Sequence, residues 1–286
     1  MIESFLELAD LFPNAITSGI IMSIACSLIG VYVVLKRVVF ISIALSETAA
    51  CGIAAAMLLN IHPLIGSVAL TVMVVMLLSV NYEMSRIPRD AVLGVVFLLA
   101  AGLSILLVSK SGFGLHEIRA MLYGDLILAG SHDRNVLLVA ITPALIFFLC
   151  FLRPITYTFL DRDASQVMGL SCRLWEISFF LVLGLVVSAA SKNGGALLVF
   201  CYLVAMPATA LLLTRRLAAV FVISLVVAIM STLSGMTLSH HHDLPTNQTI
   251  IVLSCVVFAA AFMLRGLVLR LEARGVRLGN NNSNDK

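Results

Sequence analysis

A single carboxylate lies deep inside a long apolar stretch near the start of the chain. Residues 38–59 are apolar enough and long enough to cross a bilayer, which takes roughly 20 residues, and Glu47 lies near their middle. Cys51 follows one helical turn later on the same face. Carboxylates and thiolates are metal ligands, and a charge at this depth is costly unless it faces a protein interior or a wet path. We therefore expect these two residues to mark a polar pathway.

Each of these residues also has a purely structural interpretation. Glu47 can be a carboxylate that is protonated, or hydrogen-bonded to a serine or threonine of another helix. A lone cysteine inside a span is most often a small core residue, which favours packing for Cys51. The neighbours Ser42, Ser46 and Gly52 are small, so another helix or a solute could come close. Replacing Glu47 and measuring transport would separate the two interpretations.

Histidines form a second set of residues that could bind a metal. His62, His116 and His132 lie in polar segments, and a run of three, His240 to His242, is followed by Asp243. Neutral imidazole is a common ligand of transition metals, so these residues suit capture of a metal such as zinc. The alternative is that loops are simply where polar residues occur. The sequence leaves both possibilities open.

The composition requires a membrane to hold these residues. The chain has 286 residues, of which 61% are hydrophobic and only 12% are charged, against about 25% charged in ordinary soluble proteins. Long apolar stretches without strict alternation predict helices, so we expect an all-α polytopic membrane protein with eight or nine transmembrane helices. The nine predicted spans are 14–35, 38–59, 63–82, 90–109, 135–152, 174–190, 195–214, 217–238 and 247–268.

The basic residues predict how the chain is oriented. Only four of the 18 basic residues, Lys110, Arg119, Arg134 and Lys192, fall on one side of these spans. The positive-inside rule places that side outside, so we expect an external amino terminus, a cytoplasmic carboxyl terminus and all histidines on the outer face. Because basic residues here report orientation, no nucleic acid partner is expected. Residues 1–272 are predicted to form one transmembrane domain, followed by a disordered cytoplasmic tail, 273–286.

Two segments on the predicted inner side could contact a partner. The first, 159–173, carries Asp161 and Gly169, and the second, 205–217, carries Pro207 and Ala208 and then Arg215 and Arg216. Short cytoplasmic helices of this kind can dock into a groove, although ordinary loops that obey the positive-inside rule would look the same.

Several motifs of energy-using and hydrolytic enzymes are missing from the sequence. No lysine follows a glycine, which excludes the GxxxxGK[ST] phosphate loop, and HExxH and GxSxG are also absent. We therefore expect no enzymatic activity in this chain. Energy for any transport must come from an ion gradient or from another chain.

Four stretches, in this order, resemble the permease subunits of metal-ion ABC importers, which take up zinc, manganese or iron. They are 33–57, 161–170 (DRDASQVMGL), 194–217 (GGALLVFCYLVAMPATALLLTRRL) and 242–253 (HDLPTNQTIIVL). The resemblance covers almost the whole chain. It implies a permease fold like that of vitamin B12 and siderophore importers, in the bacterial cytoplasmic membrane.

The resemblance also implies partners and roles. It implies a permease homodimer in lipid, two cytoplasmic ATPase subunits and an external metal-binding protein. Pro207, Ala208, Arg215 and Arg216 become the preferred ATPase-coupling residues, with the segment from Asp161 to Gly169 second. No tightly bound cofactor is expected, since the metal is the transported substrate. The outer histidines favour zinc over manganese or iron.

The sequence departs from the family pattern in the second span. Where family members carry an Asp, a His and a Pro, this chain has Ile43, Glu47 and Cys51, and the outer Thr-Gly is Thr246-Asn247. In a dimer, two copies of Glu47 and Cys51 would present two carboxylates and two thiols, a set compatible with tetrahedral zinc. We expect this pair to replace the usual ligands as a transient site.

Two other classes of protein could use an intramembrane carboxylate. A secondary transporter driven by protons or sodium would use a residue such as Glu47, but it should show inverted repeats with broken helices at matched positions, which the sequence does not show. An intramembrane enzyme would need several catalytic groups at matching depths, and one carboxylate is too few. An adjacent ATPase would favour the importer over the secondary transporter.

Overall fold

Helices make up the described part of the chain. The computed structural model describes residues 10–78, 89–110, 124, 126–160, 165, 167, 169 and 171–284, and no strand occurs in these ranges. Seven of the described helices are long and apolar enough to cross a membrane, and a shorter apolar helix, Pro63–Leu77, accompanies them. The predicted all-α polytopic membrane fold is confirmed.

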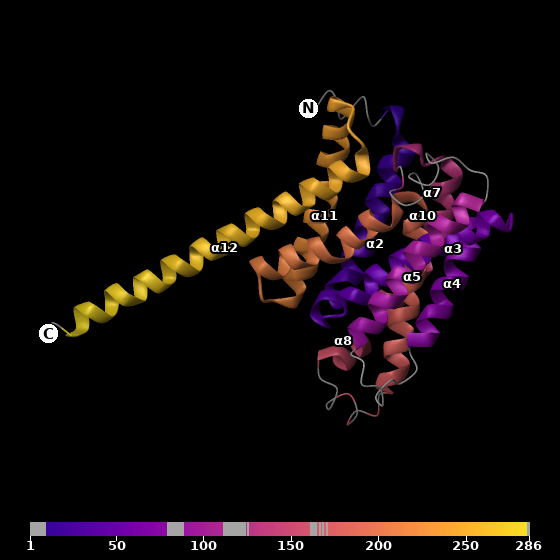
Figure 1. Cartoon of the computed structure of the whole chain (residues 1–286). Coiled ribbons are helices and arrows are strands. Elements are labelled where there is room, and N and C mark those ends of the chain that lie inside the picture. Colours follow the sequence, from indigo (N-terminus) through magenta and orange to yellow (C-terminus); the bar gives the residue numbers. More distant parts are fainter. Residues whose placement is uncertain are drawn as a thin grey trace.

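The helices pack into a bundle from which the last helix extends (Figure 1). In chain order they are α2 (Pro13–Leu35), α3 (Val39–Leu58), α4 (Pro63–Leu78), α5 (Arg89–Lys110), the short η1 (Leu126–Leu128), α7 (Ser131–Cys150), α8 (Leu152–Leu160), α10 (Cys172–Leu213), α11 (Leu217–His242) and α12 (Thr246–Asn284). Every predicted span has a counterpart among them, because α10 covers 174–190 and all but the last residue of 195–214.

α10 is two helices joined at a sharp break. Gly195 has φ 71° and ψ 163°, a conformation that essentially only glycine adopts, and the chain is helical on both sides of it. The glycine pair Gly194-Gly195 is the sequence feature that allows this break. We call residues 196–213 the second half of α10.

Local chemistry explains several helix ends. Pro13 stands in the first turn of α2, where its missing N–H costs no hydrogen bond. Arg37, just after α2, has φ 58°, and Asp243, at the end of α11, has φ 50°. Left-handed residues at these positions stop a helix and turn the chain back. Pro245 then precedes α12.

Tyr32 is the centre of an aromatic cluster that joins five helices. The rings of Phe148, Phe159, Phe179 and Phe221 lie 5.6, 6.0, 6.3 and 5.7 Å from its ring centroid. These residues come from α7, α8, α10 and α11. Edge-on aromatic contacts of this kind add roughly 0.5–1.5 kcal/mol beyond their buried area, so the cluster fixes one end of the bundle.

The bundle has two chemically different ends. We call the end that carries Lys36, Glu176 and residues 214–216 the basic end, and the end that carries His62, His132 and His240 the histidine end. The backbone of α12 is helical to Asn284, so it runs into the segment 273–286 for which the sequence predicts disorder. The division of the chain at position 272 stays a prediction.

Candidate functional site

Glu47 lies on the least buried stripe of α3. Its Oε2 atom is buried and has no hydrogen-bond partner among the described residues. Ile43, one turn earlier, is half-buried, and Phe40 is 56% exposed, so the three side chains follow one another along the helix. Most other α3 side chains beyond Ile41 are buried. In one copy of the chain Phe40 is therefore exposed, and Ile43 and Glu47 are only partly covered.

Hydroxyl groups beside Glu47 are used within α3 itself. Ser42 Oγ donates to the carbonyl of Val39 at 2.7 Å, and Ser46 Oγ donates to the carbonyl of Ser42 at 2.9 Å. Thr48 Oγ1 donates to the carbonyl of Ala44 at 2.7 Å. The hydrogens of these three hydroxyls are therefore donated within α3 and not to Glu47. The pathway role of Glu47 stays a prediction.

Cys51 is more enclosed than Glu47. It lies one turn further along α3 and is only 3% exposed. The next residue, Gly52, packs against Gly66 of α4, where an added Cβ would lie 2.5 Å from the Gly66 carbonyl oxygen. Its burial is that of a core cysteine. Its pairing with Glu47 at a metal stays a prediction.

The histidines lie in two separate places at the histidine end. The rings of His62 and His132 are 6.5 Å apart, and His240, in the last turn of α11, has its ring 6.5 Å from Phe12. His241 and His242 are exposed neighbours with rings 4.7 Å apart. Within the described ranges, no three or more His, Cys, Asp or Glu side chains are grouped to hold a metal. The predicted vestibule of His240, His241, His242 and Asp243 stays a prediction, and His116 lies outside the described residues.

Two polar contacts at the histidine end were not predicted. Lys192 Nζ lies 2.8 Å from Asp133 Oδ1, which joins α10 to the start of α7. Arg134 Nη1 donates to Asn14 Oδ1 at 2.8 Å and joins α7 to α2. The sequence feature that could have indicated these contacts is the presence of Asp133, Arg134 and Lys192 on the predicted outer side, where basic residues are few. These contacts join α2, α7 and α10 at the histidine end.

The preferred coupling segment is mostly helical. Pro207 is buried inside α10 and Ala208 is half-buried, so both belong to the helix, in agreement with the predicted span 195–214. The connection between α10 and α11 is only the three-residue turn 214–216. Arg215 and Arg216 are exposed on this turn, and the backbone N–H of Arg216 donates to Thr214 Oγ1 at 3.3 Å. Of the predicted coupling residues in this segment, these two arginines are the ones that a partner could reach.

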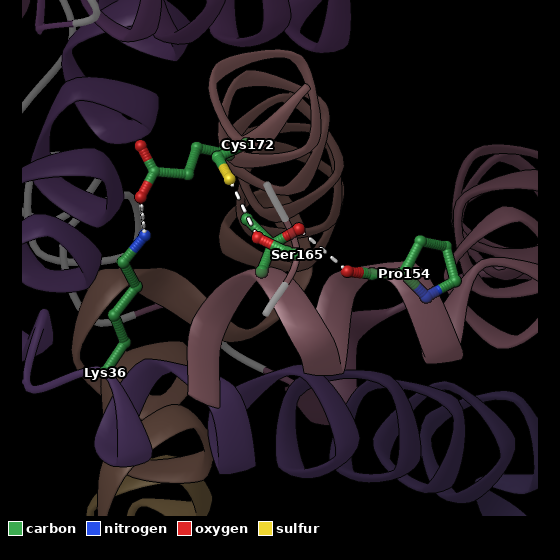
Figure 2. A network of polar contacts seen from close by, with 6 residues as sticks. Lys36, Pro154, Ser165 and Cys172 are labelled. Atoms are coloured by element: carbon green, nitrogen blue, oxygen red, sulfur yellow. Dashed lines mark hydrogen bonds and ion pairs between the residues drawn. The ribbon is translucent and has the colours of Figure 1, made fainter. Parts of the chain in front are cut away.

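The second coupling segment is anchored at the basic end. Asp161 lies outside the described residues, and Gly169 is exposed with φ 75°. Between them, Ser165 is buried, and its Oγ lies 2.9 Å from Cys172 Sγ at the start of α10. Figure 2 shows Ser165 and Cys172 together with Pro154 of α8 and Lys36. The segment is therefore attached to the bundle near its middle.

Lys36 links three helices at the same end. It follows α2, forms an ion pair with Glu176 of α10, and places Nζ 4.0 Å from the ring centroid of Phe159 in α8. Tyr32, one turn earlier, is hydrogen-bonded to Thr156 of α8. This network could not be predicted from the sequence, because the residues that pair within it are 120 or more residues apart.

A family comparison covers nearly all of this architecture. The model of the ABC 3 transport family matches residues 9–265, which include Glu47, the histidine run and the α10–α11 turn. The chain belongs to the ABC 3 transport family. The resemblance seen in the sequence is thereby confirmed.

Individual members of the ABC 3 transport family are similar over most of their length. The chain is 26% identical over 250 residues to the manganese transport system membrane protein MntC of Halalkalibacterium halodurans, covering 87% of this chain and 85% of the relative. It is 27% identical over 251 residues to the chelated iron transport system membrane protein YfeC of Yersinia pestis, covering 87% and 84%.

A solved structure supports the same fold for this ABC 3 family member. A chain of PsaBC from Streptococcus pneumoniae, solved in complex with Fab, superposes with a TM-score of 0.83 over 92% of this chain and 95% of that chain, at 19% identity. At this level of identity the likeness concerns the fold. The overall helical architecture thus belongs to a transporter fold that is already known.

Proposed function

We propose that this chain is the membrane-spanning permease subunit of an ATP-driven importer of a divalent transition metal. Membership of the ABC 3 transport family and the half-buried Glu47 in the middle of α3 support this proposal together. The sequence has no GxxxxGK[ST] motif, so a separate ATPase supplies the energy. Among these observations, the buried and unpartnered Oε2 of Glu47 carries the assignment of the pathway.

The chemistry of this site bears on which metal is transported. Glu47 offers an oxygen ligand, and carboxylates suit manganese and ferrous iron as well as zinc. The thiol that would favour zinc belongs to Cys51, which is 3% exposed. The named relatives transport manganese and chelated iron. We therefore place manganese or iron ahead of zinc, which the outer histidines alone would favour.

The partly exposed stripe of α3 supports an assembly of two permeases. Phe40 is exposed while Ile43 and Glu47 are half-buried, and a second copy packed on this stripe would place two Glu47 side chains near one axis. Two cytoplasmic ATPase subunits and an external metal-binding protein complete the proposed importer, which lies in the bacterial cytoplasmic membrane. In this arrangement the histidine end is external, and the basic end, with the carboxyl terminus, is cytoplasmic.

Transport follows by alternating access. ATP binding closes the two ATPases, which act on the turn carrying Arg215 and Arg216 and open the dimer towards the histidine end. The external protein releases metal there, and the metal passes Glu47 and leaves at the basic end. Glu47 binds the metal weakly, because a permease that held it firmly would stall release.

The test measures metal uptake by the permease reconstituted with its ATPase in liposomes. Glu47→Gln keeps the size of the side chain and removes the charge, and we expect it to lower manganese uptake at least tenfold, the loss of one good ligand. Asp90→Asn, at an exposed carboxylate in the first turn of α5, is the matched control and keeps uptake. Full uptake by correctly assembled Glu47→Gln protein would refute the pathway assignment. Iron and zinc added as competitors rank the metals.

A secondary transporter remains the alternative for an intramembrane carboxylate. Such a protein would move metal in liposomes that contain the permease alone, driven by a proton or sodium gradient. An importer, in contrast, would move metal only when the ATPase subunits and ATP are both present. Metal uptake that occurs without ATP and is abolished by an ionophore would favour the secondary transporter.

A further inference from the structure

The last helix is attached to the second half of α10 at both of its ends. At the histidine end, Asn247 Nδ2 of α12 donates to the carbonyl of Gly194 at 3.0 Å, beside the break in α10. At the basic end, Arg265 Nη1 of α12 donates to the carbonyl of Leu212 at 2.6 Å, just before the α10–α11 turn. Both bonds cross from a side chain of α12 to the backbone of α10, so they hold one helix against the other at two distant points.

The two attachment points are equally spaced on both helices. Asn247 and Arg265 are 18 residues apart, and Gly194 and Leu212 are also 18 residues apart. At 1.5 Å per residue each interval is about 27 Å, close to the thickness of a bilayer core. α12 and the second half of α10 therefore run parallel, in register, between the two ends of the bundle, and Figure 1 shows them side by side.

Each of these two hydrogen bonds lies beside a part of α10 whose displacement would affect the proposed transport. Leu212 is among the last residues of α10, whose carbonyls have no partner within the helix, and a guanidinium is a favourable partner for them. The turn with Arg215 and Arg216 follows directly. At the other end, Gly194 and Gly195 are packed so tightly against Gly124 that a Cβ on Gly124 would lie 2.4 Å from their backbone. A displacement of the break would therefore also displace Gly124.

We propose that Asn247 and Arg265 are positioning residues that clip α12 to the second half of α10, so that both helices move as one body between the α10–α11 turn and the break at Gly195. This inference rests on the proposed function, in which the ATPase acts on that turn. Because protein interiors are densely packed, a force applied at one end of two packed helices displaces both helices with little compression. A single helix with a break at one end and a proline, Pro207, within it would bend instead. α12 is hydrogen-bonded to α10 at Asn247 and at Arg265, and it prevents this bending.

The experiment compares metal transported per ATP hydrolysed, using the full permease and its ATPase in liposomes. Arg265→Met keeps the length of the side chain and removes the donor, and we expect ATP hydrolysis to persist while metal per ATP falls about fivefold or more, as for a lost coupling interaction. Arg265→Lys, which can still donate to the Leu212 carbonyl, should recover most of the ratio. Asn247→Ala should lower the ratio in the same way. The double variant should be no worse than Arg265→Met alone, because either broken clip already releases the pair.

Arg134→Met is the matched control, since it also removes a partly buried guanidinium bond, to Asn14, together with two exposed bonds to the neighbouring Asn135, all at the end of the bundle away from the turn. It should leave metal per ATP unchanged. A ratio that stays normal in both Arg265→Met and Asn247→Ala overturns the inference. So does a proportional loss of transport, ATP hydrolysis and assembly, which is the pattern of a purely structural role. An unaltered complex that hydrolyses ATP without moving metal would instead contradict the proposed function.

Discussion

Gly52 of α3 and Gly66 of α4 bring two backbones into direct contact. A Cβ added to either residue would lie 2.5 Å from the carbonyl oxygen of the other. Small residues at such a crossing let membrane helices approach closely and gain packing energy where the hydrophobic effect is weak. The contact lies just over one turn after Glu47, so it fixes the height and rotation at which α3 presents that carboxylate.

The first prediction concerns this contact. Gly52→Ala or Gly66→Ala should separate α3 from α4 and cost about 1–3 kcal/mol, the usual effect of overpacking. Thermal unfolding of the purified protein in detergent measures the loss. Gly102→Ala is the control, because an added Cβ at that position of α5 meets no atom within 4 Å. Equal midpoints for all three variants would show that the contact is not tight.

Hydropathy and glycine placement predict much of this fold. Each span was visible as an apolar run, and the Gly194-Gly195 pair marked the division of α10. Both features are local, because the length of an apolar run and the conformational freedom of glycine depend on neighbouring residues. The α10–α11 connection lies where the predicted spans 195–214 and 217–238 placed it. Pro207 is buried within the helix, since packing in a membrane tolerates proline inside a span.

Contacts between distant segments could not be predicted in the same way. Glu47 was identified because a charge inside a span is conspicuous in the sequence. The partner of Arg265, in contrast, is a backbone carbonyl, which has no signature in the sequence. The same holds for Asn247, which bonds to the carbonyl of Gly194. Which helices lie side by side depends on the shape of whole faces, and single-sequence patterns do not encode that.

The second prediction tests the histidine run as a capture site. Replacing His240, His241 and His242 together by alanine should raise the metal concentration for half-maximal uptake by up to about tenfold, equal to about 1.4 kcal/mol, and leave the maximal rate unchanged. The reason is that the run would act before the pathway, on encounter with metal. A parallel variant, His62→Ala with His132→Ala, tests the other histidine pair. An unchanged concentration dependence for the run would leave it without a role in capture.

The third prediction tests orientation. Single cysteines placed at His241 and at Arg215, both exposed, in a chain whose native cysteines are replaced, should react differently with a membrane-impermeant maleimide. In intact cells the cysteine at 241 should be labelled and the one at 215 should not, because the positive-inside rule places the basic end in the cytoplasm. Both should react after the membrane is permeabilised. The reverse pattern would invert the proposed direction of transport.

The fourth prediction separates the ion pair of Lys36 at the basic end from its contacts with aromatic rings. Its side chain and that of Glu176 are 21% and 29% exposed, so the ion pair alone should contribute about 0–1 kcal/mol. Lys36 Nζ also lies 4.0 Å from the ring centroid of Phe159, which adds roughly 0.5–1 kcal/mol. Lys36→Met, which removes the ion pair and the cation–π contacts with Phe159 and Phe180, should therefore destabilise the purified protein more than Glu176→Gln, which removes only the ion pair. Thermal unfolding at low and high salt measures the stability of both variants.

Salt should reduce the effect of Glu176→Gln, because ions screen a partly exposed pair. Equal losses in the two variants would mean that the Phe159 ring contributes nothing to holding Lys36.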